Sequence, residues 1–230
     1  MPKGSSDSGF FGVDAFRFLR ELGKNNNREW FQTNKGRYEA AIQEPAVRFI
    51  ASMGPRLARL APHVVADPRP FGGSLSRIYR DTRFSKDKSP YKTHVGIHFA
   101  HEDGASSGRN LPGFFFHLAP SESMVASGIW HPVPPDLVQI RDAIVADSTG
   151  WGKVLKGQIE IGGESYVRVP AGYDAGHPYA DDLRRKDFYA SRPFPDAAVV
   201  SGGFASKFEA ACRELNPLNQ FLADALGVPL

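Results

Sequence analysis

Cysteine is almost absent from this sequence: of its 230 residues, only Cys212 carries a thiol. A single cysteine excludes an internal disulfide and any zinc site built from thiolates. Cys212 falls on the apolar face of a predicted helix, with Phe208 and Leu215, so we interpret it as a packed thiol and not as a nucleophile.

Long apolar runs are missing too. No stretch approaches the ~20 apolar residues that a membrane-spanning helix needs. Residues 1–9 are polar and lack the apolar core of a signal peptide, so we expect a disordered tail there. Residues 10–230 are expected to form one domain. Together these features predict a soluble, cytoplasmic protein with no membrane partner.

Two familiar signatures, the phosphate-binding P-loop and the His-Glu-x-x-His metal motif, are also lacking. Gly72-Gly73-Ser74 does not continue into the Gly-Lys-Ser/Thr ending of a phosphate-binding P-loop. No His-Glu-x-x-His motif is present. We therefore predict no metal site, and the sequence identifies no cofactor.

Positive charge is modest overall but concentrated in one stretch. The chain carries a formal net charge of +3, whereas residues 76–94 contain six cations and two acids, a net +4. We call residues 76–94 the basic block. Its cations are Arg77, Arg80, Arg83, Lys86, Lys88 and Lys92, and its acids are Asp81 and Asp87. This concentration indicates a site for a negatively charged ligand more strongly than the net charge does.

Hydrophobic periodicity predicts an α+β fold in a single domain. Short connections between the predicted strands favour a mainly antiparallel sheet, with helices packed from the N-terminal and C-terminal segments. Asn27 is expected to cap the second helix. Helices are predicted over residues 14–22, 28–44, 45–60, 135–145, 151–155 and 203–215, with a last helix opened by Pro217; strands are predicted over 75–80, 93–99, 113–118, 123–129, 166–169 and 188–191.

The basic block has the chemistry of an anion site. An arginine guanidinium offers a rigid fork of donors that matches phosphate or carboxylate oxygens. Asp81 can hold one or two of the arginines in place, and Tyr79, Phe84 and Tyr91 interleave the charges. The irregular connection over residues 81–92 is long for a compact domain, which is typical of functional loops. The alternative is a salt-bridged loop whose arginines and aspartates serve each other.

Histidines provide the second set of candidates. His94 and His98 share one face of the predicted strand, and His117 lies on its expected neighbour. The three imidazoles could bind zinc, an interpretation that no spacing motif supports, or one of them could transfer a proton beside a bound phosphate. His94, next to the block, is the best catalytic candidate. Asp81 is its rival, although nearby arginines should keep that carboxylate ionised and poorly basic.

The block also resembles a known family. Its pattern is Arg77-x-x-Arg80-Asp81-x-Arg83-Phe84 followed by Asp87-Lys88-x-x-Tyr91-Lys92-Thr93-His94, and it is similar to the bacterial domain-of-unknown-function family 2461. Further matching motifs cover most of residues 14–190, although Ala171 stands where a basic residue is expected. The family has no assigned activity. The resemblance implies that the block is the functional centre, and that Trp30, Trp130, Arg141 and Tyr173 could converge on it.

We therefore predict a protein that binds a phosphorylated or other anionic small molecule; the sequence does not decide whether it is an enzyme. The predicted ligand-binding residues are Arg77, Arg80, Arg83, Lys86, Lys88, Tyr91 and Lys92. Two other functions stay open. The lysines and aromatic rings could bind nucleic acid, or the basic loop could dock an acidic protein partner.

Overall fold

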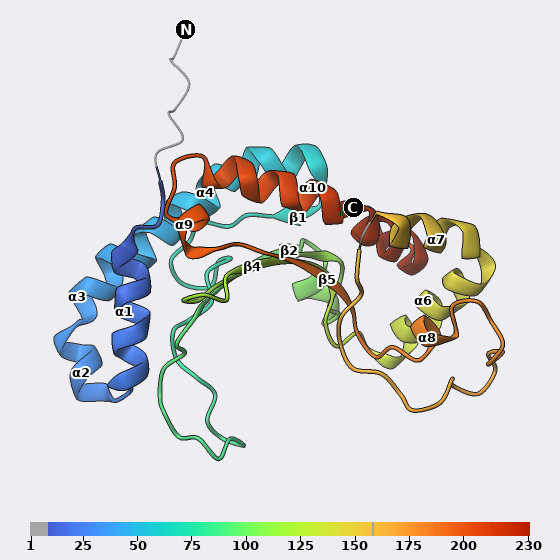
Figure 1. Ribbon diagram of the computed structural model, residues 1–230, viewed down its shortest axis with the longest axis horizontal. Coiled ribbons are helices and arrows are strands. Elements are labelled where there is room, and N and C mark those ends of the chain that lie inside the picture. The colour runs from blue at the N-terminus through green and yellow to red at the C-terminus, as the bar shows by residue number, and fades with distance from the viewer. Residues whose placement is uncertain (1–8, 158) are drawn as a thin grey trace, which may run out of the picture.

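The centre of the computed structural model, which describes residues 9–157 and 159–230, is an antiparallel sheet. Its strands follow the chain in the order β1-β2-β3-β4-β5 (Figure 1), which confirms the predicted α+β class. Apart from Gly9, the tail predicted over residues 1–9 lies outside the described residues. The strands are β1 (Val64–Val65), β2 (Val95–His101), β3 (Gly113–Leu118), β4 (Met124–Ile129) and β5 (Phe188–Pro193).

Strand alternation gives the sheet two different faces, as the sequence predicted for residues 93–99. Val95, Ile97 and Phe99 of β2 are buried, whereas His98 is exposed. In the antiparallel pairing of β2 with β3, Gly96 lies opposite His117 and His98 lies opposite Phe115. These four residues therefore lie on the face opposite the buried side chains.

Two long helices cover the apolar face. α4 (Glu44–Leu60) and α10 (Phe204–Leu226) run across it (Figure 1). Phe49 of α4 and Phe208 of α10 pack on Phe116 of β3, with ring centroids 5.5 and 5.3 Å away. The other helical segments are α1 (Val13–Lys24), α2 (Arg28–Thr33), α3 (Lys35–Tyr38), the π-helical η1 (Glu39–Gln43), α5 (Gly104–Ser107), α6 (Pro134–Ala146), α7 (Ser148–Lys156), α8 (Ala180–Leu183) and α9 (Asp196–Val199).

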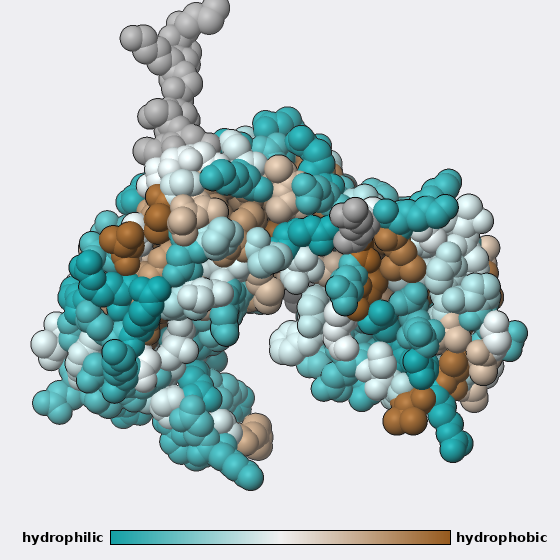
Figure 2. Space-filling model, viewed as in Figure 1, coloured by the Kyte–Doolittle hydropathy of each residue, from teal (hydrophilic) through white to brown (hydrophobic). Residues whose placement is uncertain are grey.

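The second face of the sheet borders an open space. In Figure 1 the helices α1–α3 and the basic block descend on one side of the sheet, and α6–α8 form a lobe on the other. Figure 2 shows that the space between these two parts stays open when all atoms are drawn. We call this space the hollow. Within the described residues no helix is both long and apolar enough to span a bilayer.

Two predicted strands do not form. Over residues 75–80 there are only two isolated bridges, Leu75 with Ile97 and Tyr79 with Tyr91, because the chain pairs first with β2 and then with its own returning segment. Over residues 166–169 the chain continues as a loop beside the connection from α8 to β5. Its neighbouring contacts are a bridge from Ser165 to Arg185 and the Tyr166 amide bonded to the Arg184 carbonyl.

The predicted break at Pro217 is also wrong. α10 continues through this residue as one helix of 23 residues. Proline removes one backbone hydrogen bond from the helix. Leu215 and Leu218, on either side, are fully buried, so packing outweighs that loss.

Candidate functional site

The basic block forms a loop with a narrow neck. The Arg80 amide donates to the Pro90 carbonyl at 2.9 Å, and the Lys92 amide donates to the Ile78 carbonyl at 2.8 Å. Between these bonds residues 81–89 extend away from the sheet. In Figure 1 this segment is the long green excursion beside α1 and α2.

Asn26 fastens the neck to the N-terminal helices. Its Nδ2 donates to the Tyr91 carbonyl at 2.9 Å, and its Oδ1 accepts the Tyr91 amide at 3.1 Å. The Tyr91 ring is buried and stacks on Phe31 of α2 at 4.1 Å between centroids. Asn27 caps α2, as predicted, by accepting the Trp30 amide. Tyr91, predicted to contact a ligand, therefore lies mainly in the core and forms a pocket wall.

Arg80 is held inside the loop. Its guanidinium contacts the Asp87 carboxylate and the Ser89 hydroxyl, and Nη2 reaches the Ser85 hydroxyl at 3.4 Å. The Ser89 amide, followed by Arg80 and the Ser89 hydroxyl, lowers the pKa of Asp87 to about 2. Arg80 is thus rigidly positioned, and most of its charge is balanced by Asp87.

Arg83 is likewise occupied. Its Nη2 donates to Asp81 Oδ2 at 2.7 Å and its Nε to Asp81 Oδ1 at 3.0 Å, with both side chains exposed. The Arg83 side chain, with its backbone amide, lowers the pKa of Asp81 to about 2. Asp81 is therefore ionised and a weak base near neutral pH. Phe84 follows at the loop tip with 95% of its surface exposed.

The other block cations remain available. Among the described residues, the side chains of Arg77, Lys86 and Lys92 have no hydrogen-bond or ion-pair partner, and Lys88 donates only to the Thr82 carbonyl at 2.9 Å. Lys92 is half-buried. Burial first, and the charge of Arg77 second, lower the pKa of its ammonium group.

Two adjoining pockets flank the neck, and we call them together the block site. The first has a volume of about 850 Å³ and the second about 720 Å³. Asn26, Arg80, Ser89 and Tyr91 line both. The first is lined by Arg28 and Lys88 but by no carboxylate, whereas Asp81, Asp87, Lys92 and His94 line the second.

Arg28 is the site residue that sequence reasoning missed. It begins α2, far from the block along the chain, and lines the first pocket because the Asn26–Tyr91 bonds bring α2 against the neck. Its side chain has no partner among the described residues. The available signal was its place directly after Asn26-Asn27, within a segment already matched to the family.

The predicted histidines meet on the uncovered face of the sheet. The rings of His94 and His117 lie 4.6 Å apart between centroids. Burial, then the charges of His117, Lys92 and Arg80, lowers the pKa of His94 to about 4. Loss of hydration also lowers the pKa of His117 and of His98, although the His98 ring is open to the hollow.

The surroundings of these histidines do not favour a bound metal ion. Across residues 9–157 and 159–230, no three His, Cys, Asp or Glu side chains are grouped so that they could hold a metal ion. The charges of Lys92 and Arg80 next to His94 would also repel a cation.

A serine motif lies between β2 and β3. Residues 104–108, Gly-Ala-Ser-Ser-Gly, match the Gly-x-Ser-x-Gly pattern of nucleophile elbows. An elbow places its serine on a sharp turn from strand to helix. Here Ser106 lies inside the four-residue helix α5 and donates its hydroxyl to the Asp103 carbonyl at 3.1 Å. No hydrogen bond joins it to a histidine in the described part of the chain, so the match does not indicate a nucleophile.

None of the four residues expected to converge on the block lines either pocket of the block site. Trp30 packs on Phe18 behind the neck, at 5.6 Å between centroids. Trp130 follows β4 and stacks on His131, while Arg141 and Tyr173 belong to the lobe across the hollow. Arg141 donates to the Leu183 and Arg185 carbonyls, and the Tyr173 hydroxyl donates to Asp142. Arg141 therefore holds that lobe together and does not line the block site.

Comparison with known proteins agrees with the resemblance noted from the motifs. Neither the curated proteins nor the solved structures contain a significant match to the chain. The model of one protein family, described as "Conserved hypothetical protein (DUF2461)", matches residues 14–221, nearly the whole chain. The protein belongs to this family.

Proposed function

We propose that this protein binds a phosphorylated or otherwise anionic small molecule in the block site. The observation that carries the proposal is the lining of the first pocket, which includes Arg28, Arg80 and Lys88 but no carboxylate. Because Asp87 balances Arg80, the effective positive charge of this pocket comes from Arg28 and Lys88.

The arrangement of these cations suits an anion with several oxygens. Arg80 is pre-positioned by Asp87 and the serine hydroxyls, so its fork loses little freedom when a ligand binds. Arg28 has no internal partner to give up, and Lys92 in the second pocket is equally free. A ligand that spans both pockets would therefore contact a positively charged side chain on each side of the neck.

Any proton transfer at this site would fall to His94. It lines the second pocket together with Lys92, and its imidazole is neutral at pH 7, although a pKa lowered to about 4 makes it a weak base. Asp81 is weaker still, because Arg83 lowers its pKa to about 2.

A thermal-shift screen against phosphate, sulfate, sugar phosphates and nucleotides tests the proposal. A ligand at ~100 times its dissociation constant should stabilise the native state by about 2.7 kcal/mol, a midpoint rise of roughly 5 to 11 °C. Arg28→Ala and Lys92→Ala should abolish the rise. Arg48→Ala and Lys156→Ala remove exposed cations elsewhere and should preserve it.

Arg83→Ala sharpens the test. Its guanidinium is already occupied by Asp81, so this variant should still respond to the ligand. An unchanged midpoint with every anion tested, or an equal rise in wild type and Arg28→Ala, would contradict the proposal.

A further inference from the structure

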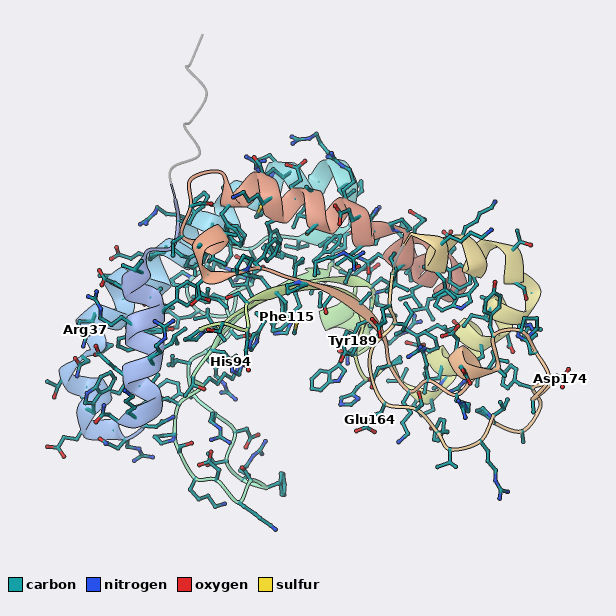
Figure 3. The ribbon with its side chains drawn as sticks, viewed as in Figure 1. Arg37, His94, Phe115, Glu164, Asp174 and Tyr189 are labelled. Atoms are coloured by element: carbon teal, nitrogen blue, oxygen red, sulfur yellow. The ribbon has the colours of Figure 1, made fainter. Side chains whose placement is uncertain are left out.

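A row of four rings lies on the uncovered face of the sheet. His94 and His117 are 4.6 Å apart between ring centroids, and His98 and Phe115 are 4.5 Å apart. Phe115 and His117 connect the two pairs at 6.3 Å. In Figure 3, His94 and Phe115 lie on the side of the sheet that faces the hollow, with Tyr189 of β5 farther along the same side. We call these four residues the ring row.

Gly96 makes room for the row. A side chain at this position would place its Cβ only 3.0 Å from Cε2 and 3.2 Å from Cζ of Phe115. The Phe115 ring therefore lies over the backbone of β2 instead of standing away from it. Because α4 and α10 cover the other face of the sheet, the ring row borders the hollow.

The imidazoles in the row act as neutral aromatic surfaces. None of the three has a hydrogen-bond or ion-pair partner among the described residues. Loss of hydration lowers the pKa of all three, and Lys92 adds to this at His94 and His98. Glu122 acts in the opposite direction at His117. At neutral pH the row therefore presents π faces and little charge.

Positive charge lies at one end of the row. His94 lines the second pocket with Lys92, Arg80, Asp81 and Asp87. Asp87 is paired with Arg80 and Asp81 with Arg83, so Lys92 supplies the unpaired positive charge beside His94, and both Lys92 and Arg80 act on its imidazole. The first pocket, with Arg28 and Lys88, continues on the other side of the neck. A ligand that fits both features has an anionic group next to a flat aromatic group.

We propose that the ring row stacks on the base of a nucleotide whose phosphate is bound by Lys92 and Arg80 at the block site. This inference rests on the proposed anion site and names its ligand class. Base stacking on aromatic side chains tolerates any base, because every base has a π face. Additional phosphates, or the backbone of a single strand, would continue past the neck to Arg28 and Lys88. The nucleotide is therefore either free or one unit of a single strand.

Calorimetric titration of the full-length protein with AMP and with ribose 5-phosphate separates the base from the phosphate. If the row binds the base, wild type should bind AMP roughly 5- to 150-fold more tightly than ribose 5-phosphate, the range for one stacked base. Phe115→Leu keeps an apolar side chain without the π face and should lower this ratio. Phe71→Leu, a change at an exposed phenylalanine in another loop, should retain it.

His98→Ala provides a second variant if Phe115→Leu fails to fold. His98 is exposed and lies at the far end of the row, so its loss should reduce the same ratio without disturbing the core. Anisotropy of a labelled eight-residue oligouridylate then identifies the source of the nucleotide. Tighter binding of the strand than of UMP, weakened by Phe115→Leu, indicates single-stranded nucleic acid, and equal binding indicates a free nucleotide.

The possible failures are distinguishable. Equal affinities of wild type for AMP and ribose 5-phosphate, with no response of strand binding to Phe115→Leu, would overturn the ring row as a base site and leave the anion site standing. Absence of binding to all four ligands, together with no thermal shift with any anion, would overturn both proposals.

Discussion

Replacing Asn26 with alanine tests whether one side chain holds the block site together. Asn26 makes both of its hydrogen bonds to the backbone of Tyr91, at 2.9 and 3.1 Å, and Tyr91 itself is 1% exposed. Each bond contributes about 0.5–1.5 kcal/mol net, and a buried amide or carbonyl left without a partner costs somewhat more. We expect the variant to lose about 2–3 kcal/mol of stability, a fall in midpoint of roughly 4 to 12 °C for a chain of this size.

The neighbouring asparagines are matched controls with different roles. Asn27→Ala removes the cap of α2 and should lower the free energy of unfolding by about 1 kcal/mol. Asn25→Ala removes one exposed bond to the Glu21 carbonyl and should lower it by less than about 1 kcal/mol. The expected order of destabilisation is therefore Asn26, then Asn27, then Asn25.

Urea denaturation of the three variants measures this order, and limited trypsin digestion measures its local effect. Without the Asn26 bonds the neck should open more often, so cleavage after Arg83, Lys86 and Lys88 should be faster in Asn26→Ala than in Asn25→Ala. If Asn26→Ala were no less stable than Asn25→Ala, the paired backbone bonds would not be what fastens the loop.

Three further changes have definite expected results. Gly128→Ala should destabilise the protein by more than about 3 kcal/mol, because φ is +116° and the new Cβ would lie 2.1 Å from the Phe188 carbonyl oxygen. Gly36→Ala is the control: a Cβ there meets open space, so this change should be neutral or slightly stabilising. Between pH 6.5 and about 4, His94 binds a proton in the unfolded chain but not in the folded protein, so the free energy of unfolding falls as the pH is lowered through this range. His94→Gln should make this fall smaller, which urea melts of both proteins over a pH series would show. Arg141→Met should cost about 3 kcal/mol in thermal melts, because it leaves the buried Leu183 carbonyl and the partly buried Arg185 carbonyl without their charged donor.

The features predicted correctly are those that a local pattern determines. Alternation from His94 to Phe99 identified which side chains share a face, because the period of a strand is independent of its partners. It therefore placed His94 and His98 together, with His117 on the neighbouring strand. Pro217 shows the limit: a local rule predicted a new helix, but burial on both sides of the proline decided the outcome.

Within the candidate site, the sequence predicted the cations but not their partners. Arg80 could have paired with Asp81, and Arg83 with Asp87; the turn between them produces the reverse. Pairings of this kind depend on the path of an irregular loop, which has no periodicity to read. Arg28 could not be assigned to the pocket before the contact between Asn26 and Tyr91 was known. The ligand-binding roles themselves stay predictions.

α10 has a mechanical consequence for the molecule. Its N-terminal half packs through Phe208 on Phe49 of α4, and its C-terminal half packs through Phe221 on Trp151 of α7, so one helix of about 34 Å joins the helical layer on the apolar face of the sheet to the α6–α8 lobe (Figure 1). Pro217 lies within that helix at the position where a backbone hydrogen bond is missing. Because Leu215 and Leu218 on either side of it are fully buried, side-chain packing at this point supports the contacts of α10 with both α4 and α7.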